Sequence, residues 1–185
     1  MPVRSSPVRN DCATRPTVNT DHPGPSYPVI HPPINPSIVH VFVYGTLRPG
    51  DVRWSYLEPF VTDGGIADSV DGSLFDTGED YPAATFAPTP TGNGTGSNLI
   101  HGRTFRITET LLDECLAVLD VEEDTVAGRY RRVAITTQAG LDVWAYEYGF
   151  GMDLVPIPSG DWFEHRPPSP HIQAAADSGS PRPHP

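Results

Sequence analysis

The distribution of proline limits which part of the chain can fold. Nine of the 22 prolines lie in residues 1–36 and eight in residues 156–185, so only five lie between them. Proline lacks an amide hydrogen and interrupts helices and sheets. Residues 1–36 and 166–185 also lack a periodic apolar pattern, so we expect both to be disordered tails. The sequence therefore predicts one domain at residues 37–165, which is long enough for a hydrophobic core.

Short β-rich segments dominate the predicted domain. They are rich in β-branched and aromatic residues and are bounded by turn-forming residues, which is typical of strands. A turn at Gln138-Ala139-Gly140 joins the last two of them. Strands are expected at residues 38–44, 80–86, 99–107, 129–136 and 141–148, with two more within residues 64–76.

One segment has the apolar periodicity of an amphipathic helix, and it predicts the main helix at about residues 109–120. Thr108 is its expected N-cap. A shorter helix is expected at residues 54–60. Several short strands with one main helix predict an α+β fold, a small mixed, mostly antiparallel β-barrel or curled sheet with the helix packed on it. The apolar stripe of the main helix consists of Leu111, Leu112, Cys115, Leu116 and Leu119.

The charge of the domain excludes several functions. All twelve basic residues are Arg, so lysine Schiff-base chemistry is excluded. Residues 37–163 carry 19 acids and 7 arginines, a formal charge of −12, which disfavours binding to nucleic acid or an anionic membrane. No metal-ligand spacing occurs, so no metal or cofactor is predicted. Without an apolar leader or an apolar stretch of membrane-spanning length, the sequence predicts a cytoplasmic protein.

The strand at residues 38–44 ends in a tight turn that begins at Gly45 and closes at Pro49-Gly50. Because glycine has no Cβ, a small ligand can approach its backbone closely. The amides of such a turn can form a nest that binds an anion or an oxyanion. An ordinary transition from strand to turn also explains these residues, and on this stretch alone it is the favoured explanation. Tyr44, the last strand residue, either binds a ligand or packs in the core.

An acidic cluster follows the predicted helix: four of the five residues 120–124 are acids. Negative charge at a helix C-terminus opposes the helix dipole, so helix stability does not explain it. If helical geometry continues, Glu123 lies about 40° from Leu119 on the apolar face, and Glu122 points about 100° away. A carboxylate against the core is desolvated, which raises its pKa and makes it a better base. The alternative is a solvated helix end with surface acids only.

Six short stretches of the domain form one ordered set of motifs: Tyr44-Gly45-Thr46-Leu47-Arg48-Pro49-Gly50, Tyr81-Pro82-Ala83, Gly102-Arg103-Thr104-Phe105, Leu119-Asp120-Val121-Glu122-Glu123, Tyr130-Arg131-Arg132-Val133 and Ser159-Gly160-Asp161-Trp162. In this order they resemble the γ-glutamylcyclotransferase-like family, which is also described as the avirulence-induced-gene-like family. In the γ-glutamylamine cyclotransferase branch, the catalytic glutamate ends a Leu-Asp-x-x-Glu motif, and this position falls on Glu123 rather than Glu122. A glycine normally follows that glutamate, whereas Asp124 stands here.

The resemblance implies an enzyme that converts a γ-glutamyl amine or a small γ-glutamyl peptide to 5-oxoproline and a free amine, without a cofactor. Glu123 is then the general acid and base. A non-catalytic module that binds a small carboxylate or a protein partner is the alternative. An enzyme that removes a γ-glutamyl cap from a specialised metabolite is a third possibility. The expected substrate-binding residues are Tyr44, Gly45, Thr46, Leu47 and Tyr130.

Other residues of these stretches are open to structural explanations. Tyr130 either contacts substrate or packs. Arg131 and Arg132 can attract a carboxylate, but alternation along a strand places at least one of them in solvent. Arg48 is expected on the loop surface, Trp162 in the core and Asp161 in a turn.

Overall fold

The computed structural model describes residues 32–86, 99–151 and 153–166. The outer parts of the predicted tails, residues 1–31 and 167–185, lie outside the described residues. The last part of the predicted N-terminal tail contacts the domain, because Arg132 donates a 3.5 Å hydrogen bond to the carbonyl of Pro32. In the described part of the chain, no helix is both long enough and apolar enough to cross a membrane.

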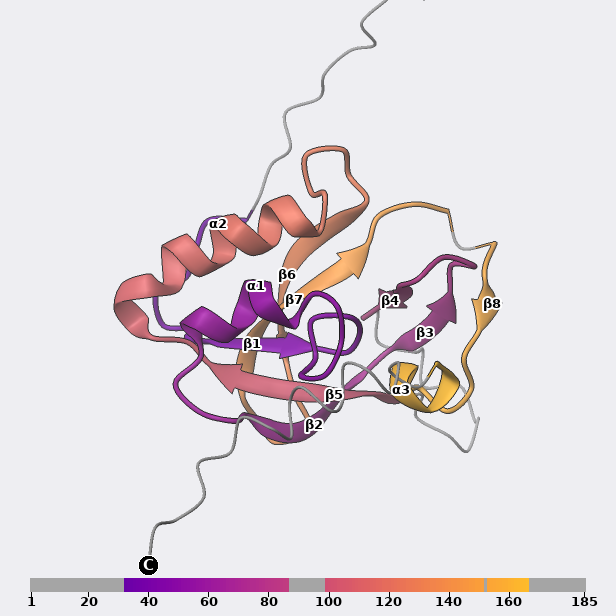
Figure 1. The fold of residues 1–185 in the computed structure, drawn as a ribbon, viewed down its shortest axis with the longest axis horizontal. Helices are drawn as coiled ribbons and strands as arrows, with labels where there is room; N and C mark the ends of the chain where they lie inside the picture. Colours follow the sequence, from indigo (N-terminus) through magenta and orange to yellow (C-terminus); the bar gives the residue numbers. More distant parts are fainter. Residues whose placement is uncertain (1–31, 87–98, 152, 167–185) are drawn as a thin grey trace, which may run out of the picture.

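A five-stranded curled sheet forms the centre of the fold (Figure 1). Its strand order is β2–β5–β1–β7–β6, and β1 and β7 run parallel whereas the other neighbours are antiparallel. The sheet is therefore mixed and mostly antiparallel, as predicted. The strands are β1 (His40–Val43), β2 (Ile66–Asp71), β5 (Leu99–Arg106), β6 (Tyr130–Thr136) and β7 (Asp142–Tyr148).

The sheet is curled but not closed, so the barrel alternative is wrong and the curled-sheet alternative is correct. The turn after β6 reaches β2, where the Gln138 amide donates to the carbonyl of Ser69 at 2.8 Å. Among the described residues, β2 and β6 form no ladder with each other and remain the two edges of the sheet. Contact through a single turn cannot replace the row of paired backbone groups that barrel closure requires.

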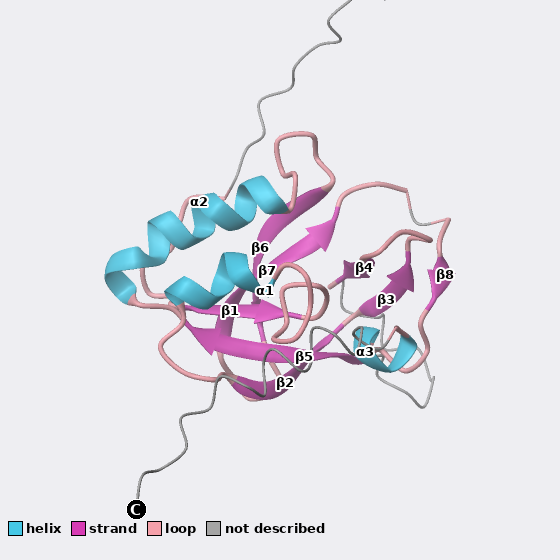
Figure 2. Cartoon of the chain, in the orientation of Figure 1, coloured by secondary structure: helices cyan, strands magenta, loops and turns pink. Residues whose placement is uncertain are grey.

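A second sheet of three short strands packs beside the first, in the order β4–β3–β8 (Figure 2). Hydrogen bonds join the two sheets: the Phe86 amide, just after β4, donates to Glu147 on β7 at 3.0 Å. The hydroxyl of Tyr130 on β6 donates to the Pro82 carbonyl on β4 at 2.5 Å. The strands are β3 (Ser73–Asp76), β4 (Pro82–Thr85) and β8 (Val155–Pro156).

The main helix lies on one face of the large sheet, as expected. It consists of a 3₁₀ turn, η2 (Glu109–Leu111), followed by α2 (Leu112–Glu122). Thr108 is the N-cap residue, as expected, but its side chain makes no capping hydrogen bond. Instead, the Thr108 carbonyl accepts from the Leu111 amide at 2.8 Å, because the helix opens with a 3₁₀ turn.

Two shorter helical segments complete the fold. The predicted helix at residues 54–60 is present as α1 (Trp54–Leu57) and the 3₁₀ turn η1 (Glu58–Phe60). A helix that was not predicted, α3 (Trp162–His165), follows the expected turn, and the Asp161 carboxylate caps it by accepting from the Phe163 amide at 2.9 Å. Trp162 is buried, as expected.

The strand β1 is buried on both faces, which explains its uninterrupted apolar sequence. Val41 and Val43 face the cluster beneath α1 and α2, together with Leu116 and Leu119 of α2. Phe42 and Tyr44 face a second cluster toward the small sheet and α3. The C-terminal end of β1 therefore emerges between two packed layers, where the turn that begins at Gly45 is held on both sides.

Candidate functional site

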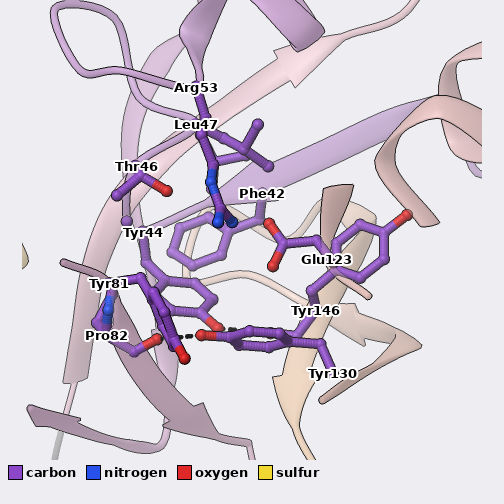
Figure 3. A pocket seen from close by; sticks show the side chains of 12 residues that line it. Phe42, Tyr44, Thr46, Leu47, Arg53, Tyr81, Pro82, Glu123, Tyr130 and Tyr146 are labelled. Atoms are coloured by element: carbon purple, nitrogen blue, oxygen red, sulfur yellow. Dashed lines mark hydrogen bonds between the residues drawn. The ribbon is translucent and has the colours of Figure 1, made fainter. Parts of the chain in front are cut away.

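A pocket opens at the C-terminal end of β1, where the end of α2 and the start of β4 approach it (Figure 3). All six residues that the sequence singled out for catalysis or substrate binding line this pocket. Residues separated by some eighty positions along the chain thus meet at one site. The lining consists of Phe42, Val43, Tyr44, Gly45, Thr46, Leu47, Arg53, Tyr81, Pro82, Glu123, Tyr130 and Tyr146.

The end of α2 places Glu123 at the pocket. Glu123 is the C-cap of the helix, and its amide still donates to the Leu119 carbonyl at 2.9 Å. Asp124 has a positive φ of 49°, and its amide donates to the Val121 carbonyl at 3.1 Å. The Thr125 amide donates to the Asp120 carbonyl at 3.1 Å. These are the two bonds of a Schellman motif, which reverses the chain at the residue after Glu123.

The Schellman motif explains the departure at Asp124. The position after Glu123 needs the left-handed backbone conformation, which glycine adopts most easily and which Asp tolerates better than most residues. Asp124 therefore keeps the chain reversal that a glycine would provide, and Glu123 remains directed into the pocket.

Glu123 is only 8% exposed. Burial raises the pKa of its carboxyl to about 7, the neighbouring Arg53 lowers it, and Glu122 raises it. Within the described part of the chain, no cation lies within ion-pair distance of Glu123. A carboxyl with a pKa near neutrality can both accept and return a proton at neutral pH.

The turn after β1 supplies backbone donors. Among the described residues, no group accepts a hydrogen bond from the Thr46 or Leu47 amide, although the Thr46 carbonyl accepts from the Arg53 amide at 3.1 Å. Gly45 also lines the pocket. A Cβ at Gly45 would lie 2.8 Å from Cγ of Pro82, so the missing side chain makes room for Pro82.

Tyrosine rings form the pocket walls, and their hydroxyl protons are already used. Tyr44 donates to the Tyr146 carbonyl at 2.6 Å, and Tyr130 donates to the Pro82 carbonyl at 2.5 Å. Burial raises the pKa of both phenols, so they stay neutral and cannot act as bases. Each hydroxyl oxygen keeps a lone pair that can accept from a bound amine. Both residues thus pack in the core and line the pocket.

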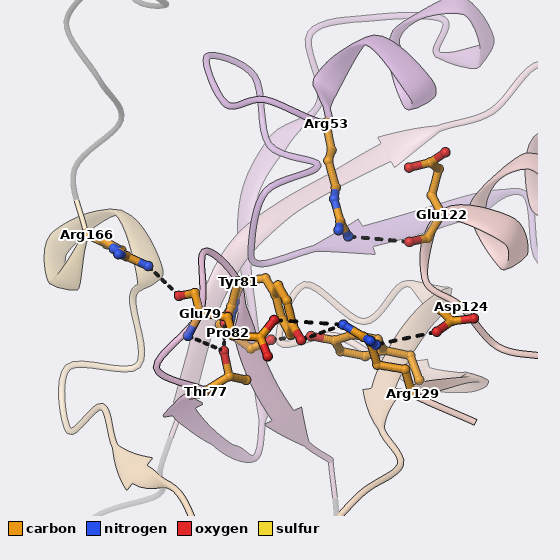
Figure 4. Close-up of polar contacts among 10 residues, drawn as sticks. Arg53, Thr77, Glu79, Tyr81, Pro82, Glu122, Asp124, Arg129 and Arg166 are labelled. Carbon is orange, nitrogen blue, oxygen red and sulfur yellow. Dashed lines mark hydrogen bonds and ion pairs between the residues drawn. The ribbon is translucent and has the colours of Figure 1, made fainter. Parts of the chain in front are cut away.

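Arg53 and Tyr81 were not among the expected site residues, yet both line the pocket. Arg53 precedes α1, and its guanidinium lies 5.8 Å from the centre of the Tyr81 ring (Figure 4). A second arginine, Arg129, also contacts Tyr81. It donates to the Tyr81 hydroxyl at 2.6 Å and pairs with Asp124 at 3.5 Å. Tyr81 has a sequence signal, since it belongs to one of the six stretches, whereas Arg53 has none.

Three arginines of the six stretches, Arg48, Arg131 and Arg132, make ion pairs outside the pocket. Arg48 pairs with Asp161 at 2.7 Å and is only 18% exposed, so it is less open to solvent than expected. Arg131 is 71% exposed, as alternation predicted for one of the two neighbours, and Arg132 is buried against Asp120. Within the described residues, no three His, Cys, Asp or Glu side chains gather in a way that could hold a metal ion.

Comparison with known proteins identifies the family of this chain. The family model described as "Gamma-glutamyl cyclotransferase, AIG2-like" matches residues 41–164. A Vibrio cholerae protein, whose name proposes a gamma-glutamylcyclotransferase, is 36% identical over 123 residues, which are 66% of this chain and 93% of that protein.

Two solved structures share the fold. An uncharacterised protein from Pyrococcus horikoshii has a TM-score of 0.50 at 25% identity, over 69% of this chain and 92% of that one. A uropathogenic E. coli protein has a TM-score of 0.50 at 18% identity, over 69% of this chain and 94% of that one. The family model covers more than half of the chain, including every residue of the pocket, and the chain therefore belongs to the gamma-glutamyl cyclotransferase, AIG2-like family.

Proposed function

We propose that this protein converts a γ-glutamyl amine or a small γ-glutamyl peptide to 5-oxoproline and a free amine. The observation that carries the proposal is a buried carboxyl, Glu123, in the same pocket as the Thr46 and Leu47 amides, which have no acceptor among the described residues. Forming a lactam from a γ-glutamyl group needs one base, one oxyanion site and a folded substrate. The pocket offers groups suited to the first two.

In the proposed reaction the α-amino nitrogen of the substrate, in its neutral form, attacks the substrate's own γ-carbonyl carbon. One N–H proton passes to the Glu123 carboxylate. The bond from the γ-carbon to the leaving nitrogen then breaks, and Glu123 returns the proton to that nitrogen. One C–N bond forms and one breaks, so neither water nor a cofactor is consumed. Holding the amine against the carbonyl supplies much of the rate enhancement.

Negative charge develops on the γ-carbonyl oxygen during the attack. The Thr46 and Leu47 amides are the candidate donors to it, and their missing partners leave them available. The hydroxyl oxygens of Tyr44 and Tyr130 are candidate acceptors from the attacking amine, because their protons point to backbone carbonyls. These roles for Tyr44, Thr46, Leu47 and Tyr130 are part of the proposal. The assignment of this chain to the γ-glutamylamine branch of the family is also part of it.

A panel of γ-glutamyl amines and γ-glutamyl peptides, with 5-oxoproline as the measured product, tests the proposal. We expect at least one compound to be turned over, and Glu123→Gln to lower that rate at least about 10²-fold. Glu122→Gln is the matched control, since it alters a neighbouring acid that does not line the pocket. Full activity of the Glu123→Gln variant would rule out Glu123 as the base.

Two other outcomes would distinguish the alternatives. If no compound is turned over while 5-oxoproline still raises the melting temperature, the non-catalytic binding module is favoured. If turnover occurs only with an unusual amine such as an aminoglycoside, the enzyme that removes a γ-glutamyl cap is favoured.

A further inference from the structure

Arg53 brings a guanidinium into the pocket, and no carboxylate in the described part of the chain pairs with it. Six of the other arginines in the described residues, from Arg48 to Arg166, lie within ion-pair distance of an acid. In the same residues Arg53 makes no ion pair and one long side-chain hydrogen bond, from Nη1 to the Glu122 carbonyl at 3.4 Å. A guanidinium carries five N–H donors in a fixed plane, so most of its bonding capacity is unused.

The surroundings of Arg53 hold the guanidinium in place. Its amide donates to the Thr46 carbonyl at 3.1 Å, which joins Arg53 to the turn after β1. Its Nη1 bonds a carbonyl of the last turn of α2, where a cation favours the helix dipole. The Tyr81 ring lies 5.8 Å from the guanidinium and provides a cation–π contact. These three contacts come from three different elements, so Arg53 is positioned before any ligand binds.

The side chain points toward the Glu123 carboxylate (Figure 3) without pairing with it. A base that receives a proton from an amine thus stands beside a fixed cation. An α-amino acid carries an amine and a carboxylate on one carbon, and this arrangement is complementary to the neighbouring Glu123 and Arg53. The γ-glutamyl group has such an α-amino acid end.

We propose that Arg53 binds the α-carboxylate of the γ-glutamyl substrate and orients the α-amino group toward Glu123. This inference rests on the proposed function and specifies how the same pocket selects its substrate. It commits the pocket to compounds with a free α-carboxylate, whatever amine leaves. Because Arg53 binds the α-carboxylate in this proposal, the Thr46 and Leu47 amides are left to bind the γ-carbonyl oxygen.

The test combines a change in the protein with a change in the ligand. Wild type, Arg53→Gln and Arg53→Lys are assayed with a γ-glutamyl amine and with the same compound bearing an α-carboxamide. Arg106→Gln is the matched control, because Arg106 pairs with Glu109 on the exposed surface outside the pocket. The wild type and the control are expected to prefer the carboxylate by about 10²-fold, the size of one charge-assisted hydrogen-bonded pair.

In Arg53→Gln we expect the preference to fall below about threefold, with KM rising more than kcat falls, and in Arg53→Lys to return in part. An unchanged preference in Arg53→Gln would overturn the proposal. So would a loss seen only with γ-glutamyl amino acids and absent with γ-glutamyl amines, because Arg53 would then bind the leaving group.

A binding measurement separates this inference from the proposed function. Calorimetry compares 5-oxoproline with 5-oxoprolinamide, neither of which needs turnover. If no γ-glutamyl compound reacts but the wild type still prefers 5-oxoproline and Arg53→Gln does not, the cyclisation proposal fails and the Arg53 assignment stands. If turnover occurs but both proteins bind the two lactams equally, the Arg53 assignment fails alone.

Discussion

Two acids three residues apart at the end of α2, Asp120 and Glu123, differ in the partners of their carboxylates. Asp120 is fully engaged: one carboxylate oxygen pairs with the buried Arg132 at 2.7 Å, and the other accepts from the Tyr146 hydroxyl at 2.8 Å. Glu123 is also buried but has no ion pair in the described part of the chain, and Arg53 beside it is equally unpaired. A buried charge that is paired stabilises a packing arrangement, whereas one that is left unpaired is available for chemistry.

Neutralising the two acids should therefore have opposite consequences, and the largest effect concerns activity. Glu123→Gln is expected to lose about 10²- to 10⁴-fold in kcat while the protein stays folded, because the base is removed and the shape is kept. Steady-state release of 5-oxoproline, with circular dichroism on the same samples, measures both. A fall in activity of similar size in Glu122→Gln would show that the acidic cluster acts as a whole, and it would contradict a specific role for Glu123.

The next effect concerns stability. Asp120→Ala is expected to lower the free energy of unfolding by about 3–5 kcal/mol, because it leaves the guanidinium of Arg132 buried without its carboxylate partner. Urea denaturation measures this, and Glu122→Ala, on the same helical turn, should stay within about 0.5 kcal/mol of wild type. The folded Asp120→Ala protein should keep its activity within several-fold. A loss of activity equal to that of Glu123→Gln would assign chemistry to Asp120 as well.

The pH dependence sharpens the comparison. Glu123 has a pKa of about 7 in the folded protein against 4.5 for an ordinary glutamate, so the folded state binds more protons between these values. Wild-type stability should then fall as pH rises from about 4.5 through about 7, by on the order of 3 kcal/mol.

Glu123→Gln has no carboxyl to ionise at this position, so its stability relative to wild type should increase with pH. Wild-type activity should rise through about pH 7. Melting temperatures of both proteins from pH 4 to 9 provide the measurement. The charged or titratable groups near Glu123 are Arg53, Glu122, Tyr44, Tyr130 and Tyr146. Parallel stability curves for the two proteins would mean that Glu123 is not desolvated.

The smallest effect concerns the chain reversal that separates the two environments. Asp124 has a left-handed backbone, so Asp124→Gly should leave stability unchanged or raise it by up to about 1 kcal/mol, and Asp124→Ala should lower it by about 1 kcal/mol. The Arg129 contact at 3.5 Å is partly exposed and contributes little to the difference. Urea midpoints rank the three proteins, and an alanine variant more stable than the glycine variant would contradict the Schellman assignment.

Much of the secondary structure could be predicted because its signals are local. The apolar spacing from Leu112 to Leu119 corresponds to α2, and the alternating strands around a turn at residues 138–140 correspond to β6 and β7. Continuing the helical angle also placed Glu123 on the buried side. The α3 helix was missed because its signal is only one cap and four residues, which is too short for periodicity.

Other features could not be read locally. The packing of Pro82 against Gly45 could not be predicted, because Pro82 lies on a strand more than thirty positions away in the chain. Arg53 has no motif of its own and becomes a pocket residue only when the start of α1 packs beside the end of α2. Closure of the sheet depends on the distance between its two edge strands, β2 and β6. The sequence of a single segment does not determine that distance.

The sequence by itself determined the repeating patterns, the acid at the end of the main helix and the glycine turn after the first strand, because backbone sterics and apolar spacing act between near neighbours. Only the tertiary structure decided which charges found partners. Pairing depends on distances of a few ångströms between residues far apart in the chain. That same packing gave Asp120 an arginine and left Glu123 without one.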